Sequence, residues 1–141
     1  MHHIAIMRKS WGLLPKILSG EKKIESRWYM SRVAPWNRIK SGETVYFKDS
    51  GSPITLKAEV SKVIQFSDLT SNKVKEILSN YGSKIGIYDT NKFFKRFKSK
   101  KYCILVFLKN PKEVKPFNID KTGFGLMSAW ISVEDVDRIK K

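Results

Sequence analysis

The order of apolar and polar residues predicts a strand, a helix and a second strand near the start of the chain. Residues 3–8 (HIAIMR) have the composition of a short strand. Apolar residues then recur at helical spacing, and Gly20 follows them where a glycine suits the end of a helix. From residue 22 to residue 29 the period changes to two, which is typical of a strand. The apolar residues of the helix are Leu13, Leu14, Ile17 and Leu18.

The middle of the chain predicts a β-hairpin followed by helices. Residues 42–49 and 54–60 alternate apolar and polar side chains, and the turn residues SGSP separate them. Apolar residues at helical spacing over 74–81 predict a helix that ends at Gly82. The segment 90–101 (TNKFFKRFKSKK) predicts a further helix or turn with a strongly basic surface.

The last third of the chain contains the strongest signal for a buried strand. Residues 102–108 (YCILVFL) are a continuous apolar run, so we expect a central strand covered on both faces, with Cys103 as inert core. We expect 109–116 (KNPKEVKP) to be a loop and the segment 128–132 (SAWIS) to pair at a sheet edge. A capping-box pattern then predicts a final helix. Its capping and buried residues are Ser132, Asp135, Val133, Val136 and Ile139.

These elements follow one another as strand, helix, several strands, helices, strand and helix. The steady β–α alternation of a parallel α/β protein is missing, so we expect an α+β fold with a curved sheet or an open barrel. The chain has 141 residues and no stretch that resembles a linker. We therefore expect a single domain over 1–141.

The charge balance points to a polyanionic partner. The sequence has 28 Lys and Arg against 13 Asp and Glu, a formal net charge of +15. Such a field attracts nucleic acid above all, and an anionic membrane more weakly; the alternative is a lysine-rich composition without functional meaning. No apolar run is long enough to span a bilayer, and we expect no membrane association. One cysteine cannot form an internal disulfide, so we expect a cytoplasmic location.

The octet GEKKIESR at 20–27 places one acid between two bases in this basic chain. Glu25 and Arg27 are two residues apart on a predicted strand, so they share a face, with about 7 Å between their Cα atoms. One interpretation is a surface ion pair worth under about 1 kcal/mol, with Lys22 solvated. The other is a cleft, in which the two cations hold a phosphate and Glu25 orients them.

The spacing Gly20, Lys22, Glu25, Arg27 is G-x-K-x-x-E-x-R, which resembles the signature of the ASCH domain of the PUA-like superfamily. The chain is similar to that family along its length, with a leading strand and helix, a Gly-Glu at 42–43 that opens the next strand, and a late apolar strand. The resemblance implies a PUA-like open β-barrel of about five to six mixed strands flanked by helices. It also implies a cleft whose floor carries the motif. Members of the family have been proposed to bind RNA, and some branches hydrolyse nucleic acid or modified nucleosides.

We therefore expect RNA, a nucleotide or a nucleoside as the ligand, with no cofactor and no metal. Arginines and aromatic residues interleave over 27–38, as base stacking and phosphate contact require. Trp28 shares the face of Ile24 and is predicted to be buried, whereas Tyr29 shares the face of the motif carboxylate. The candidate ligand-binding residues are Gly20, Lys22, Glu25, Arg27, Tyr29, Arg32 and Trp36.

Two further groups of residues complete the list of candidates. The polar side of 90–101 is a candidate track for phosphates or, alternatively, a solvated charged face. The track residues are Lys92, Lys95, Arg96 and Lys98, with Lys100 and Lys101 beyond them. His2 and His3 lie at an expected frayed terminus without a carboxylate or thiol cluster, so they do not predict a metal site.

An enzyme is the alternative to a binding module. In an amidohydrolase acting on acylated nucleosides, Lys22 would be the nucleophile or base and Glu25 a second catalytic candidate. The hydrolase branch of the family pairs the motif lysine with a hydroxyl and a later carboxylate, for which Ser26 and Glu76 are available here. Glu25 stands where that hydroxyl is expected. A ribonuclease would need a general acid and base, and the sequence offers no clear pair.

Overall fold

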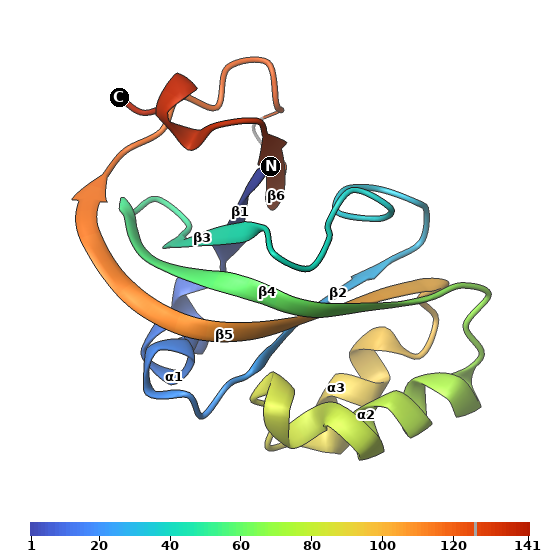
Figure 1. Ribbon diagram of the computed structural model, residues 1–141. Helices are drawn as coiled ribbons and strands as arrows, with labels where there is room; N and C mark the ends of the chain where they lie inside the picture. The colour runs from blue at the N-terminus through green and yellow to red at the C-terminus, as the bar shows by residue number, and fades with distance from the viewer. Residues whose placement is uncertain (126) are drawn as a thin grey trace.

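The computed structural model describes residues 1–125 and 127–141, which form one six-stranded sheet and three α-helices (Figure 1). The strands are β1 (His2–Met7), β2 (Ile24–Tyr29), β3 (Thr44–Asp49), β4 (Ile54–Phe66), β5 (Tyr102–Phe117) and β6 (Trp130–Val133). The helices are α1 (Leu13–Ser19), α2 (Ser71–Ile85) and α3 (Thr90–Phe97), with short 3₁₀ turns η1 (Lys9–Trp11) and η2 (Val136–Arg138).

The sheet is mixed and strongly curved. Its strand order is β2-β5-β4-β3-β1-β6, and every neighbouring pair is antiparallel except β1 and β3. The two long strands, β4 and β5, pair through several register shifts, which bend a sheet, and Figure 1 shows both curling around the molecule. This architecture confirms the predicted α+β fold with a PUA-like open barrel.

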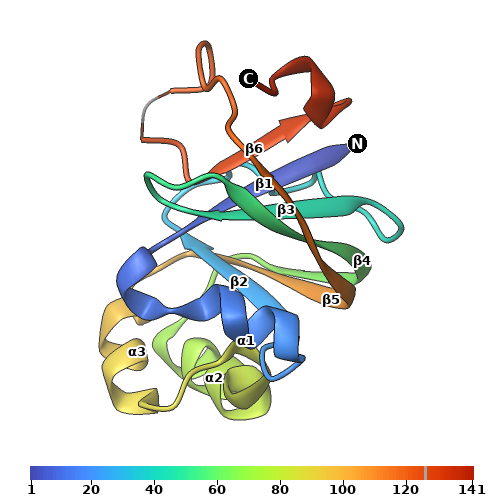
Figure 2. The ribbon, with the colours of Figure 1, turned by 90° about the vertical axis from the view of Figure 1, so that its left-hand side faces the viewer.

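The two faces of β2 serve different parts of the molecule. Ile24 and Trp28 pack with α2 and α3 in one core, which confirms that Trp28 is buried. Glu25 and Arg27 lie on the other face, towards the barrel interior, beside the core that contains Ile104. Figure 2 shows the helices below β2 and the C-terminal segment with β6 at the opposite end.

The apolar run at 102–106 is a central strand, as predicted. Cys103 is fully buried, and this burial raises the pKa of its thiol. The prediction of a loop over 109–116 was wrong, because these residues continue β5 and pair with the first half of β4. Beyond residue 107 β5 no longer pairs with β2, so Pro111 and Pro116 lie in a part of the strand that is a sheet edge, where proline is tolerated.

Three other predictions need correction. The helix α2 continues through Gly82 to Ile85, because Ile85 extends the buried stripe, and it ends at Gly86, whose φ is 90°. The expected final helix is only the single turn η2, and Ser132 belongs to β6, which pairs with β1 at the sheet edge. The N-terminus is not frayed, since β1 lies between β3 and β6 and His3 is fully buried.

No helix in the described part of the chain is long and apolar enough to cross a membrane.

Candidate functional site

Two glycines set the course of the backbone around the start of β2. Gly20 ends α1 with a φ of 84°, a left-handed conformation that favours glycine. The chain then returns along the helix, and the amide of Lys22 donates to the carbonyl of Lys16 over 2.9 Å. Gly86 approaches from the end of α2, where a Cβ atom would lie 3.6 Å from Cδ of Lys22. The lysine side chain is thus enclosed between α1 and α2.

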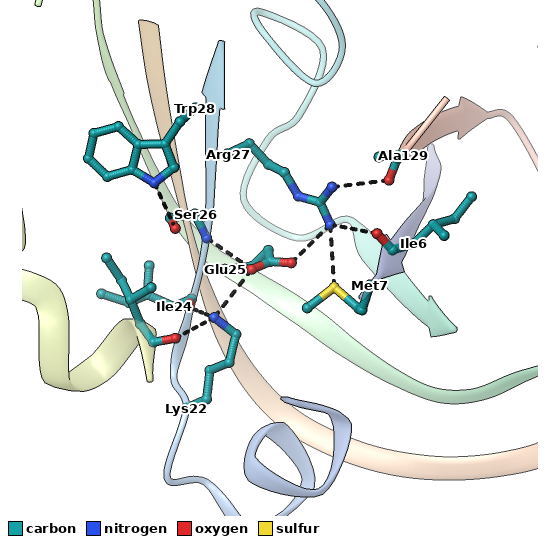
Figure 3. Close-up of polar contacts among 10 residues, drawn as sticks. Ile6, Met7, Lys22, Ile24, Glu25, Ser26, Arg27, Trp28 and Ala129 are labelled. Carbon is teal, nitrogen blue, oxygen red and sulfur yellow. Dashed lines mark hydrogen bonds and ion pairs between the residues drawn. The ribbon is translucent and has the colours of Figure 1, made fainter. Parts of the chain in front are cut away.

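Lys22 is a buried ammonium group with every donor engaged. The residue is 2% exposed. Its Nζ donates to the carbonyl of Ile24 at 2.7 Å and to that of Ile85 at 2.6 Å, and it lies 3.2 Å from Oε1 of Glu25 (Figure 3). Three acceptors match the three N–H bonds of a charged lysine. Burial lowers the pKa of Lys22, and the neighbouring carboxylate opposes that shift.

Glu25 is the anion between two cations. It is 4% exposed, and its Oε2 accepts from Nη2 of Arg27 at 3.0 Å while Oε1 accepts from the amide of Ser26 at 3.1 Å. Burial by itself would raise the pKa of Glu25, but Lys22 and Arg27 together hold it below its usual value. We call Lys22, Glu25 and Arg27 the motif cluster.

Arg27 connects the two open edges of the barrel. Its guanidinium donates to the carbonyl of Ala129 at 3.2 Å, just before β6, and to that of Ile6 on β1 at 3.4 Å (Figure 3). The side chain is 12% exposed. The interpretation as a solvated surface ion pair was therefore wrong, because Lys22 and Glu25 are buried and the side chain of Arg27 is largely so.

A cleft lies over the motif cluster, between β2, η1 and α3. It consists of a cavity of about 600 Å³ and a neighbouring one of about 220 Å³, which share part of their lining. Lys22, Glu25 and Ser26 line the larger cavity, and Arg27 and Tyr29 line the smaller one. Besides Lys22, the cations around the larger cavity are Arg8, Lys16, Lys92 and Arg96.

Aromatic rings accompany these cations. Trp11 is 36% exposed, and Cζ of Arg8 and Cζ of Arg96 each lie 5.1 Å from the centroid of its ring. Tyr88 is 64% exposed; Nζ of Lys16 lies 4.4 Å from its ring centroid, and its hydroxyl donates to Glu21. The cleft thus combines positive charge with flat apolar surface, the combination that a nucleotide requires.

The structure brings only some of the sequence candidates together. The motif cluster and Tyr29 meet Lys92 and Arg96, which were predicted as part of a separate track. Burial raises the pKa of Tyr29, so its hydroxyl stays protonated. The candidates that do not line the cleft are Gly20, Arg32, Trp36, Lys95 and Lys98.

Arg32 and Trp36 instead lie against one ring on β5. Cζ of Arg32 is 5.6 Å from the ring centroid of Tyr102, and the ring of Trp36 meets it edge-on at 5.1 Å. Sequence reasoning missed the cations and exposed aromatic rings Arg8, Trp11, Lys16 and Tyr88, which line the cleft. The signal for the first two was the pairing of an arginine with an aromatic residue directly after the first strand.

The residues of the enzyme hypothesis are only partly assembled. Ser26 lines the larger cavity, and its Oγ accepts from Nε1 of Trp28 at 3.0 Å. Glu76 is exposed on α2, pairs with Lys73 at 3.4 Å and does not line the cleft. Among the described residues, no group of three or more His, Cys, Asp and Glu side chains is placed to hold a metal ion.

Comparison with solved structures identifies the fold. The crystal structure of ASCH from Zymomonas mobilis matches with a TM-score of 0.69 and 13% identity over 94% of this chain and 87% of that one. A mutant form of the same protein matches with a TM-score of 0.71 and 13% identity, over 97% and 91% of the two chains. The N-terminal domain of Staphylothermus marinus McrB gives 0.55 and 13%, over 97% and 90%. No family model and no curated protein matches the chain.

Proposed function

We propose that this chain, which has the fold of an ASCH domain, binds single-stranded RNA or a nucleotide in the cleft over β2. One observation carries the proposal. Arg8, Lys16, Lys92 and Arg96 surround a cavity of about 600 Å³ and, among the described residues, none of them forms an ion pair with a carboxylate. Unpaired cations that converge on one cavity favour a phosphate-bearing ligand.

The rim of the cleft is formed by Arg8, Lys16, Lys92 and Arg96 with Trp11 and Tyr88, and the motif cluster forms its floor. The two parts have different roles in this proposal. The donors of Lys22 are all used within the protein, so the phosphate contacts fall to the rim cations. Trp11 and Tyr88 provide exposed rings on which a base can stack. A volume of this size is within the usual range for a small-molecule site and accommodates one nucleotide. The motif cluster shapes the floor beneath it.

The test is binding of a dye-labelled single-stranded oligonucleotide, measured by fluorescence anisotropy over a range of salt concentrations. The logarithm of the affinity should fall linearly with the logarithm of salt, by ~0.7 for each phosphate contacted. Arg96→Ala should weaken binding by about 1.5–3 kcal/mol, the scale of a charge-assisted hydrogen bond, and reduce the salt slope. Trp11→Ala should cost about 1–3 kcal/mol through lost stacking.

Lys95→Ala is the matched control, because Lys95 is an exposed cation on the same helix but does not line the cleft. Equal losses for Arg96→Ala and Lys95→Ala would mean that α3 attracts RNA diffusely rather than through the cleft. Wild-type binding by the Arg96→Ala variant would rule out the cleft. A salt-independent affinity would indicate a neutral nucleoside as the ligand.

Hydrolysis of an acylated nucleoside is the alternative, and the position of Lys22 and Ser26 in one cavity favours it. Against it, Lys22 carries no free lone pair in its observed contacts, and the candidate carboxylate Glu76 lies outside the cleft. Incubation with a panel of acylated nucleosides, followed by mass spectrometry, separates the two functions. Turnover that is lost in Lys22→Met would establish the hydrolase.

A further inference from the structure

A second group of buried polar side chains lies at the start of β1. His3 is 0% exposed. Its Nε2 lies 2.8 Å from Oε1 of Glu43, which precedes β3, and its Nδ1 lies 2.8 Å from Oγ of Ser132 on β6. Nε1 of Trp130, also on β6, donates to the same Nδ1 at 3.2 Å. We call His3, Glu43, Trp130 and Ser132 the histidine cluster.

The contacts of His3 determine which ring nitrogen carries the proton. An indole N–H can only donate, so Nδ1 is an acceptor and Nε2 carries the hydrogen that points to Glu43. His3 is therefore neutral in this arrangement. Burial lowers the pKa of His3, although the adjacent Glu43 opposes the shift.

Trp130 joins the histidine cluster to the cleft. Cζ of Arg27 lies 5.2 Å from the centroid of the Trp130 ring, a cation–π contact. The carbonyl of Ala129, the residue before Trp130, accepts from the same guanidinium at 3.2 Å. Arg27 in turn holds Glu25 and lines the smaller cavity of the cleft. A shift of Trp130 therefore changes two contacts that fix Arg27.

We propose that Trp130 is a positioning residue for Arg27 and that protonation of His3 releases it, so that ligand binding in the cleft weakens as pH falls. The proposal rests on the function proposed above. A proton on Nδ1 leaves Glu43 as an acceptor for Nε2, and the hydroxyl of Ser132 can rotate to accept. Only the indole N–H cannot change from donor to acceptor, so it alone is displaced.

Few other charged groups face His3. Glu43 is the adjacent carboxylate, and the amino group of Met1 lies 3.9 Å from its Oε2. From β6 the facing side chains are Trp130 and Ser132, neither of which titrates in this range. His2 is the neighbouring histidine; its Nδ1 accepts from the amide of Val136 and lies 3.8 Å from Oδ1 of Asp135, and its charge contributes only the smallest of the effects on the pKa of His3. His2→Asn is therefore a matched control.

The binding experiment uses an oligouridylate without terminal phosphates and a pH-insensitive dye, so that neither ligand nor label titrates. Between about pH 8 and a pH below the lowered pKa of His3, the affinity of the wild type should fall about threefold to fivefold, the value of a modest cation–π contact. The affinity of His2→Asn should fall by the same factor over the same pH range. Trp130→Phe keeps a ring beside Arg27 without the N–H, so its affinity should not change over this range. If the affinity of Trp130→Phe falls with pH as much as that of the wild type, the proposal is overturned.

A second measurement does not depend on any ligand. In ¹⁵N-labelled protein the indole N–H signal of Trp130, assigned by its loss in Trp130→Phe, should shift as the ring of His3 titrates. The signals of the other tryptophans should not follow that titration. A stationary Trp130 signal would overturn the proposal even if RNA binds. If no oligonucleotide binds at any pH, the proposed function fails, and the indole signal still decides whether His3 controls Trp130.

Discussion

The barrel interior contains two buried polar clusters that differ in the charge state of their central side chain. The motif cluster keeps three full charges out of water and balances them with one anion between two cations. The histidine cluster holds an ionisable ring in its neutral form and satisfies both of its nitrogens. The first arrangement depends on opposite charges, the second on a neutral imidazole ring at its centre. They should therefore differ in the size of the effect when they are disrupted, and in the pH at which they fail.

The largest effect should come from removing the anion of the motif cluster. Glu25→Gln preserves the shape of the side chain but leaves Lys22 and Arg27 as buried cations without a counterion. Breaking a buried pair in this way costs about 3–5 kcal/mol. Unfolding by urea, followed by circular dichroism, should show this loss in the free energy of unfolding.

Glu76→Gln is the control for that measurement, because Glu76 forms an ion pair with Lys73 on the exposed side of α2. An exposed pair contributes under about 1 kcal/mol. If Glu25→Gln destabilises the protein no more than Glu76→Gln does, then the motif cluster is hydrated in solution. Lys22 and Arg27 would in that case not depend on Glu25 as a buried counterion.

An intermediate effect should come from pH, through His3. Because burial lowers the pKa of His3 in the folded protein, the unfolded chain binds the proton more readily. Stability is then full above about pH 6.5 and falls as pH drops through the folded pKa, by at most about 1.4 kcal/mol per pH unit. His3→Asn, which cannot take up the proton, should flatten this part of the curve.

The motif cluster should respond only in more acidic solution. The cations hold the pKa of Glu25 below its usual value, so its contribution is present above about pH 4.3 and is lost as pH falls through the lower, folded pKa. Two separate decreases in urea-derived stability, the first absent in His3→Asn, would support the comparison. A single decrease shared by wild type and variant would contradict it.

The same comparison explains what the sequence could predict about the site. The motif cluster lies within a few residues on one strand and its approach, so alternation alone placed Glu25 and Arg27 on a common face. The partners of His3 are 40, 127 and 129 residues away, and only the pairing of β1 with β3 and β6 brings them together. No spacing in the sequence could reveal that cluster. The same is true of the rim, which η1 and α3 supply from distant segments.

The fold was predictable where a local pattern was strong. The hairpin of β3 and β4 and the burial of residues 103–106 followed from alternation and from a continuous apolar run. The second half of β5 was missed because its prolines and lysines are typical of loops, and only its pairing with β4 makes it a strand. The final helix was predicted wrongly because Ser132 fits a helix cap in its local sequence. In the structure it lies in β6, where its side chain contacts His3.

The smallest effect should come from Ser132, the adaptable member of the histidine cluster. Ser132→Ala removes one hydrogen bond to Nδ1 of His3, but Trp130 still donates to that nitrogen, so no buried acceptor is left without a partner. The free energy of unfolding should fall by about 0.5–1.5 kcal/mol near neutral pH, the net value of one hydrogen bond. At low pH the loss should grow, because charged His3 needs the serine hydroxyl as the acceptor for its new N–H. Urea unfolding at about pH 7.5 and at a pH below the lowered pKa of His3 measures both values. An equal loss at both pH values would mean that Ser132 does not accept from charged His3, and that the strict donor Trp130 is not the member that protonation displaces.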